Sequence, residues 1–169
     1  MRITTIKVVC TQGVNIYLYE DVKNTISELR SRHTGYTDFP MELEIQKAIK
    51  LGMDELCFTE HSDYDVPTVV NCDYDTYFEE MEKMKDKYKG QITLKTGIEF
   101  GIQTHTTKAY EETFRQYPFD FVIFSCHQVE NKEYWRQEPQ EGKTQLEYNR
   151  RYYQEILDVV KVYKDYSIL

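Results

Sequence analysis

Four segments of the sequence place a histidine or an acidic residue where an apolar, strand-like run stops. They read S-R-H-T-G-Y-T-D (31–38), C-F-T-E-H-S-D (57–63), T-G-I-E-F-G (96–101) and F-V-I-F-S-C-H (121–127). In a sheet or barrel of parallel strands, the strand ends converge on one face, so side chains far apart in sequence meet there. Imidazoles and carboxylates gathered at such an edge are ligands for zinc, manganese or iron. The recurrence therefore predicts a divalent metal site.

Three of these segments supply the main candidate ligands, His61, Glu99 and His127. For His61 the alternative is a core histidine bonded to the backbone, and for Glu99 it is a half-exposed strand whose carboxylate faces water. A carboxylate between two apolar residues is costly to bury unless it is paired or bound to a metal. His127 repeats the pattern after a nearly uncharged run. One shared site explains the three better than three coincidences.

Two further groups of residues extend this hypothesis. His33 and Asp38 form the fourth group, in a turn-prone segment that suits a loop at the edge of a sheet. Arg150 and Arg151 stand at the head of the last predicted helix, where a guanidinium can clamp a phosphate; the alternative is that both lie on a helix surface. His105 lies at a predicted helix start, where an exposed or capping role is expected, so it is left out of the metal set.

The hydrophobic pattern from Pro40 onward alternates between helical and strand spacing. Helices are predicted at 40–52, 74–89, 106–117 and 144–164, and strands at 54–60, 92–100, 119–126 and from 166 on. Strands that alternate with helices indicate a parallel α/β sheet covered by helices. Before Pro40, residues 3–9 fit a strand and residues 20–32 a helix. In the last helix we expect an inward-facing row made of Tyr153, Ile156, Leu157, Val160 and Tyr163.

Composition narrows the function classes. With 169 residues the chain is one domain or part of a larger one, and its formal charge of −8 argues against a nucleic-acid-binding surface. That charge fits either a solvated surface or an acidic rim around a metal. No stretch approaches the ~18 apolar residues of a membrane span. The four cysteines lack metal-finger spacing. Cys57 and Cys126 lie inside apolar runs, where a buried free thiol is expected, so we expect a reducing compartment and a cytoplasmic protein without a membrane partner.

Longer segments carry a resemblance to a known family. They are A-I-K-L-G-M-D-E-L-C-F-T-E-H-S-D-Y (48–64), L-K-T-G-I-E-F-G-I-Q (94–103), Y-P-F-D-F-V-I-F-S-C-H (117–127) and E-G-K-T-Q-L-E-Y-N-R-R-Y-Y-Q-E-I-L (141–157). Over about residues 33–169 the chain resembles the PHP (polymerase and histidinol phosphatase) superfamily, and within it the PHP-type histidinol-phosphatases. The resemblance implies a distorted barrel of seven parallel strands with helices outside and a metal cluster at the strand ends. It also implies hydrolysis of histidinol phosphate in histidine synthesis.

The resemblance assigns roles residue by residue. His33 is similar to the second histidine of the family's opening H-x-H, His61 to that of its T-[DE]-H element, and Glu99 to its bridging glutamate. His127 is similar to the histidine after the apolar strand, and Asp38 to an acidic ligand near the first motif. The implied catalytic residues are Glu99 and His61, with two or three zinc, manganese or iron ions in intact relatives. The implied substrate is a small phosphorylated molecule, oriented by an arginine such as Arg150 or Arg151.

Two departures from the family pattern shape the remaining expectations. Ser31 stands where the first histidine of H-x-H is expected, and no G-H-x-D element follows the last helix. We therefore expect an unmatched segment at 1–30 and a partial PHP domain at 31–169, forming an incomplete barrel with fewer metals and impaired activity. An unclosed sheet edge would favour self-association. The open alternatives are an active phosphatase, a non-catalytic metal-binding remnant and a PHP phosphoesterase for another ester.

Overall fold

The protein consists of two compact units, which are described separately. The computed structural model describes residues 7–10, 41–67 and 71–164. The first unit comprises Met1–Glu60 and Asp73–Gly97, and the second comprises His61–Cys72 and Ile98–Leu169. Strands β2 (Glu55–Ser62) and β3 (Thr93–Gly101) begin in the first unit and end in the second.

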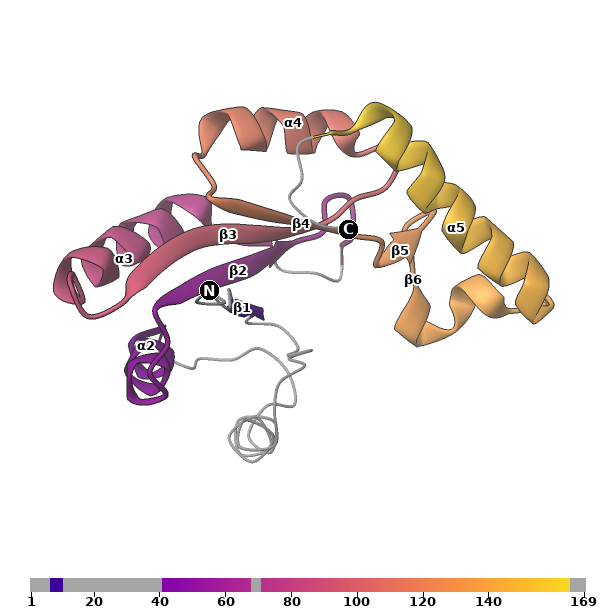
Figure 1. Cartoon of the computed structure of the whole chain (residues 1–169). Coiled ribbons are helices and arrows are strands. Elements are labelled where there is room, and N and C mark those ends of the chain that lie inside the picture. Colours follow the sequence, from indigo (N-terminus) through magenta and orange to yellow (C-terminus); the bar gives the residue numbers. More distant parts are fainter. Residues whose placement is uncertain (1–6, 11–40, 68–70, 165–169) are drawn as a thin grey trace. The chain divides into compact units, whose positions relative to one another are not determined.

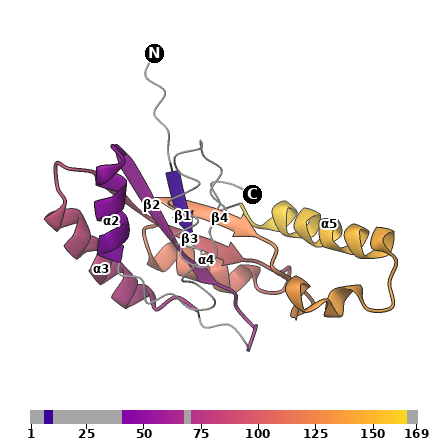
Figure 2. The same ribbon diagram turned by 90° about the horizontal axis from the view of Figure 1, so that it is seen from below.

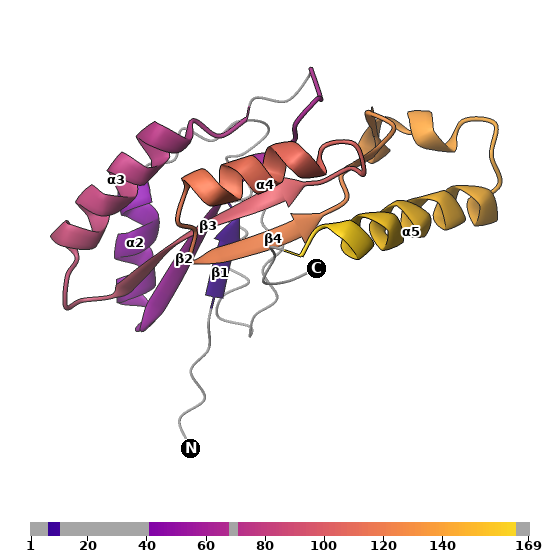
Figure 3. The ribbon, with the colours of Figure 1, turned by 90° about the horizontal axis from the view of Figure 1, so that it is seen from above.

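The sheet has the strand order β1-β2-β3-β4, in which β1 is Lys7–Cys10 and β4 is Phe121–Ser125. Strand β1 pairs with β2 in parallel, with Lys7 opposite Leu56, and the two lie next to each other in Figure 2. The arrows of β3 and β4 also point the same way (Figure 3). The predicted parallel α/β class is confirmed, and the sheet of the described residues is open rather than closed into a barrel.

Two helices in the first unit match their predictions. Helix α2 is Met41–Lys50 and helix α3 is Tyr74–Lys87. Gly52 follows α2 with φ of 69°, a backbone conformation that glycine adopts without strain. Asp73 caps α3, since its side chain accepts a hydrogen bond from the backbone N–H of Thr76. These local signals explain why the sequence pattern located both helices.

The second unit holds the remaining elements, with α4 and α5 labelled in Figure 1. The predicted helices at 106–117 and 144–164 and the predicted strand at 119–126 form, whereas the segment expected to be a polar loop contains a short hairpin and two 3-10 turns. The hairpin turn at Glu130 and Asn131 has positive φ at both residues, without the glycine that usually marks such a turn. The bounds are α4 Thr107–Gln116, β5 Gln128–Val129, β6 Lys132–Glu133, η1 Tyr134–Arg136, η2 Glu138–Gln140 and α5 Gln145–Val162.

The inward face of α5 differs from the predicted one. Tyr153 is 66% exposed and Leu157 is 48% exposed, so the prediction that they face the interior is wrong. The buried row contains Glu155 and Val159 and continues to Tyr163. Apolar residues occur in adjacent pairs along this helix, so their spacing does not determine which face of the helix is buried. Burial of Glu155 requires partners, which sequence spacing does not reveal.

Several predictions lie outside the described residues. They are the helix at 20–32, the strand from 166 on, and the metal ligands His33 and Asp38. Within the described part, Cys57 and Cys126 are free thiols, as predicted, and Cys72 is free as well. A bilayer-spanning helix is absent from the residues that the structure describes, and even α5, with 18 residues, carries charged side chains along its length.

Glu44 generates a pH-dependent prediction for the first unit. Burial and the nearby Glu60 raise the pKa of Glu44 to about 7, and its Oε2 atom has no hydrogen-bond partner among the described residues. The unfolded carboxyl ionises near 4.5, so folding stability falls as the pH rises from about 4.5 to 7. Glu44→Gln should therefore add about 2–3 kcal/mol to the free energy of unfolding at pH 8 and little at pH 4, measured by urea denaturation.

Glu42 provides a control of opposite sign on the same helix. Lys87 donates a hydrogen bond to its Oε1 atom at 2.6 Å, and Tyr88 donates another at 2.8 Å. These bonds lower the pKa of Glu42, so the stability they contribute is present above about pH 4.5 and lost below it. Glu42→Gln should weaken the fold at pH 8. Equal effects of the two substitutions at pH 8 would contradict the assignment to Glu44.

Candidate metal site

A carboxylate shared by two imidazoles forms the centre of the candidate site. His61 Nε2 lies 3.1 Å from Glu99 Oε2, and His127 Nε2 lies 3.0 Å from Glu99 Oε1. The two imidazole rings stack, with centroids 5.3 Å apart and planes 13° apart. Ser125 Oγ also donates to Glu99 Oε1 at 2.7 Å. The ends of β2, β3 and the segment after β4 therefore place their polar side chains together, all within the second unit.

The other nitrogen of His127 faces a second carboxylate. His127 Nδ1 lies 2.7 Å from Asp63 Oδ1, and Gln128 Nε2 donates to the same oxygen at 2.9 Å. Asp63 and Gln128 are both buried. A carboxylate that holds the second nitrogen of a metal-ligating histidine fixes the ring orientation and the tautomer. Asp63 is therefore placed to orient His127.

The period of two along each strand explains how these side chains meet. His61 and Asp63 are two residues apart, as are Ser125 and His127, which is the spacing that places side chains of an extended chain on the same side. Asp63 follows the last residue of β2, and His127 lies two residues beyond the end of β4. On β3 the residue two after Glu99 is Gly101. A Cβ atom on Gly101 would overlap the Asp63 carboxylate and lie 2.8 Å from His127 Nδ1. The missing side chain leaves the space that Asp63 occupies.

The charges of Asp63 and His127 stabilise each other. Burial opposes the charged form of His127, but hydrogen bonds to Asp63 and Glu99 raise its pKa to about 9. Burial also opposes ionisation of Asp63, but the hydrogen bond from His127 lowers the pKa of this carboxyl. Asp63 is thus an anion near neutral pH, and a metal ion bound at His127 Nε2 would have to displace the proton from that nitrogen.

These donor types fit a divalent cation. One nitrogen or oxygen each from His61, Asp63 and His127 lies within 4.8 Å of the other two, and Glu99 contacts both histidines. Imidazole nitrogen and carboxylate oxygen suit zinc and its neighbours in the first transition series. The neighbouring Cys126 is not one of these three grouped residues, and its Sγ atom donates to the carbonyl oxygen of Gln128 at 3.5 Å.

The sequence-predicted residues divide into three groups. His61, Glu99 and His127 are brought together as the strand-end argument expected. Arg151 instead pairs with Glu155 at 2.7 Å and Glu130 at 3.3 Å. It lines a cavity of about 310 Å³, whose wall also includes Tyr134, Lys143 and Tyr148. Arg150 is exposed near the start of α5, and His33 and Asp38 lie outside the described residues.

His105 and Glu155 complete the account of predicted and missed residues. His105 is exposed and pairs with Asp65 at 3.1 Å, in keeping with its omission from the metal set. Sequence reasoning missed Glu155, which accepts hydrogen bonds from Thr104 N at 2.6 Å and Arg151 Nη2 at 2.7 Å. Burial opposes ionisation of Glu155, but these bonds lower its pKa. The missed Asp63 stands in the quoted segment 57–63, where two-residue spacing from His61 could have identified it.

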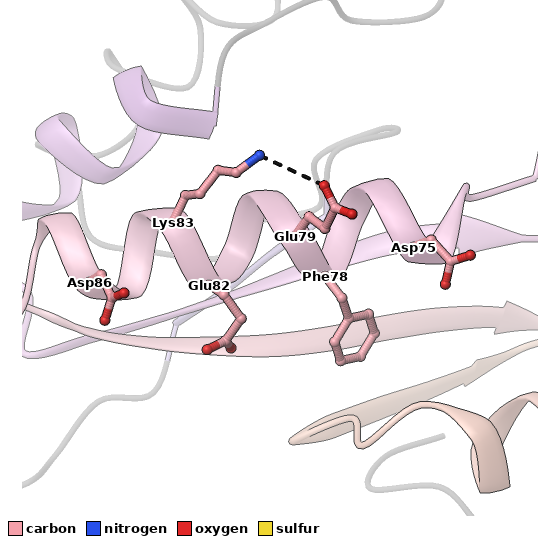
Figure 4. Close-up of a pocket in the computed structure, with 6 residues that line it drawn as sticks. All are labelled: Asp75, Phe78, Glu79, Glu82, Lys83 and Asp86. Carbon is pink, nitrogen blue, oxygen red and sulfur yellow. Dashed lines mark ion pairs between the residues drawn. The ribbon is translucent and has the colours of Figure 1, made fainter.

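A second hollow lies on α3 in the first unit and is a different kind of surface. Figure 4 shows its six lining side chains projecting from this one helix, with Lys83 paired to Glu79 at 3.8 Å. Its volume is about 690 Å³. Four of the six residues are acidic and none is a histidine, so the surface lacks the mixed ligand set of the second unit. The lining residues are Asp75, Phe78, Glu79, Glu82, Lys83 and Asp86.

Comparison with known protein families agrees with the fold. The PHP domain family matches residues 29–167, which is most of the chain. The chain belongs to the PHP domain family. The matched range contains every residue of the candidate site, including those outside the described part.

The relatives of this PHP domain include histidinol-phosphatases. It is 33% identical over 125 residues to the histidinol-phosphatase of Lactococcus lactis, a match of 73% of this chain and 46% of that protein. It is 28% identical over 87 residues to a probable histidinol-phosphatase of Deinococcus radiodurans, covering 48% of this chain and 34% of the relative. The chain thus spans less than half the length of these curated relatives.

A solved structure gives the same family assignment. The histidinol phosphate phosphatase from Lactococcus lactis, crystallised with zinc, L-histidinol and phosphate, superposes with a TM-score of 0.73 at 30% sequence identity. The match covers 79% of this chain and 52% of the crystallised chain. The chain therefore corresponds to about half of that crystallised chain.

Gly101 provides a test of how tightly the site is packed. Gly101→Ala should lower the free energy of unfolding by about 1–3 kcal/mol, because the added methyl group displaces Asp63. The same substitution in an Asp63→Ala background should cost less, since the overlapping carboxylate is gone. Urea denaturation of the four proteins gives the coupling energy. An equal cost in both backgrounds would show that the methyl group does not act through Asp63.

Proposed function

We propose that this PHP domain is a metal-dependent phosphomonoester hydrolase of the histidinol-phosphatase type. The observation that carries the proposal is the Glu99 carboxylate, whose two oxygens each face an imidazole nitrogen. Membership of the PHP domain family and the match to a zinc-containing phosphatase support the same reading. Histidinol phosphate is the proposed substrate, since both curated relatives carry that activity in their names.

In this proposal, the metal ligands are His61, Glu99 and His127, together with His33 and Asp38 from the part outside the described residues. Glu99 would supply its carboxylate oxygens to the metal, and Asp63 would orient His127 through Nδ1. A bound divalent cation lowers the pKa of a water molecule toward neutrality and screens the charge of a phosphoryl group. The protein's own residues hold the ligand atoms in place and limit the access of solvent to them.

The recognition of substrate is a separate part of the proposal. Arg150 and Arg151 remain the predicted phosphate-binding residues, and the printed contacts of Arg151 go to Glu130 and Glu155. Arg151 would have to exchange one of its two carboxylate partners for a phosphate group in order to bind it. Arg150 is exposed and is the better placed of the two to bind phosphate from solvent. The absence of a nucleic-acid partner, self-association at a sheet edge and a cytoplasmic location also remain predictions.

Metal content and phosphate release test the proposal directly. The purified chain should bind zinc or manganese and release phosphate from histidinol phosphate. His61→Ala and Glu99→Gln should each lower both properties by more than about 100-fold, because removal of a direct ligand costs more than removal of an orienting group. Elemental analysis and an inorganic phosphate assay measure the two properties.

His105→Ala is the matched control, because it removes an imidazole whose partner is Asp65 rather than the site. It should leave metal binding and phosphate release unchanged. Metal bound without hydrolysis of any phosphate ester would favour a non-catalytic metal-binding domain. Hydrolysis of other esters alone would favour a different PHP phosphoesterase, and less than one metal per chain would reject the proposal.

A further inference from the structure

The hydroxyl group of Tyr110 binds the backbone at the ends of two neighbouring strands. Tyr110 Oη donates to the carbonyl oxygen of Ser62 at 2.7 Å, with the Gly101 carbonyl oxygen at 3.1 Å. It also accepts from the backbone N–H of Tyr64 at 2.9 Å. Ser62 is the last residue of β2, and Gly101 is the last residue of β3. One hydroxyl therefore joins both strand ends.

Asp63 lies between two of these hydrogen bonds. The Ser62 carbonyl belongs to the peptide group before Asp63, and the Tyr64 N–H belongs to the peptide group after it. Tyr110 thus fixes the backbone on both sides of Asp63, while the Asp63 N–H donates to Asn71 Oδ1 at 2.6 Å. The Asp63 carboxylate in turn contacts His127 Nδ1 at 2.7 Å. A short chain of contacts leads from α4 to the imidazole of the site.

The Tyr110 ring is held firmly enough to act as such a support. Its side chain is fully buried. Its ring centroid lies 4.5 Å from that of Phe100 and 4.5 Å from that of Tyr64. Burial raises the pKa of Tyr110, so its hydroxyl keeps the proton that it donates. Tyr110 therefore acts through its hydrogen bonds to the backbone carbonyls and not through ionisation of its hydroxyl group.

Tyr77 makes an equivalent arrangement within the first unit. Its hydroxyl lies 3.0 Å from the carbonyl oxygen of Phe58 and 3.0 Å from that of Gly97. Phe58 precedes Ser62 by four residues on β2, and Gly97 precedes Gly101 by four on β3. Tyr77 is also buried. The two tyrosines thus bind the same two strands through backbone carbonyls, but only Tyr110 has an acceptor, Ser62, that lies between two residues of the candidate site, His61 and Asp63.

We infer that Tyr110 is a positioning residue for the metal site, acting through the backbone of Asp63 on the orientation of His127. This inference rests on the proposed metal-binding function and goes beyond it by assigning a role to a residue of α4. Loss of the hydroxyl leaves the Asp63 backbone free to shift, so the carboxylate no longer holds the His127 ring in one orientation. Removal of an orienting group typically costs 10–100-fold in metal affinity.

The test compares Tyr110→Phe with Tyr77→Phe in the whole chain. Each variant removes one buried hydroxyl that binds two strand carbonyls, so each should lower the Tm by roughly 2–12 °C. Zinc affinity, measured by competition with a chromophoric chelator, should fall about 10–100-fold in Tyr110→Phe and should not change in Tyr77→Phe. The visible absorption of bound Co²⁺, which reports ligand geometry, should change only in Tyr110→Phe.

The other outcomes overturn the inference. Equal zinc affinity in wild type and Tyr110→Phe would show that the hydroxyl does not position the site. Equal losses in both variants would assign the effect to general destabilisation. If Tyr110→Phe fails to fold, Asn71→Ala decides, because it removes the acceptor of the Asp63 N–H, and unchanged zinc affinity then counts against the inference. A wild-type chain that binds no zinc would instead reject the proposed function itself.

Discussion

The contact between Glu99 and two histidines is the constraint on which the rest of the second unit depends. Each carboxylate oxygen lies about one hydrogen-bond length from an imidazole nitrogen, at 3.1 Å for His61 and 3.0 Å for His127. Groups of this kind are costly to bury unless they are paired. Their partners come from different strands, so the strand ends must be held in register for the pairing to persist. The Gly101 backbone, Asp63 and Tyr110 all serve this requirement.

The geometry of a pleated strand accounts for much of this arrangement. Alternate residues of β3 and β4 face opposite sides, so the buried Phe100 and Phe124 line the core while Glu99 and Ser125 face the site. The same alternation makes Gly101 the neighbour of Glu99 on the site's side of β3. A larger residue there would occupy the space of the Asp63 carboxylate. The backbone positions of β3 that pack the core therefore also determine where the side chains of the candidate site lie.

The sequence was sufficient to predict the parallel α/β class and the convergence of three side chains of the candidate site. His61, Glu99 and His127 each follow or end an apolar run, so their convergence follows from strand direction alone. Asp63 was accessible to the same reasoning through its two-residue spacing from His61. Tyr110 was not, because its partners are backbone carbonyls of Ser62 and Gly101 that only tertiary packing brings to it.

The failure on α5 has a similar physical origin. Adjacent apolar residues such as Ile156 and Leu157 give a helix two nearly equivalent buried faces, and the choice between them depends on distant partners. Glu155 makes the choice, because the Thr104 N–H and Arg151 supply the hydrogen bonds that allow its burial. Sequence periodicity indicates which faces of a helix could be buried, whereas the hydrogen bonds of buried polar groups show which face is buried in the folded protein. The same distinction separates the three ligand candidates, visible in the sequence, from the network that holds them in place.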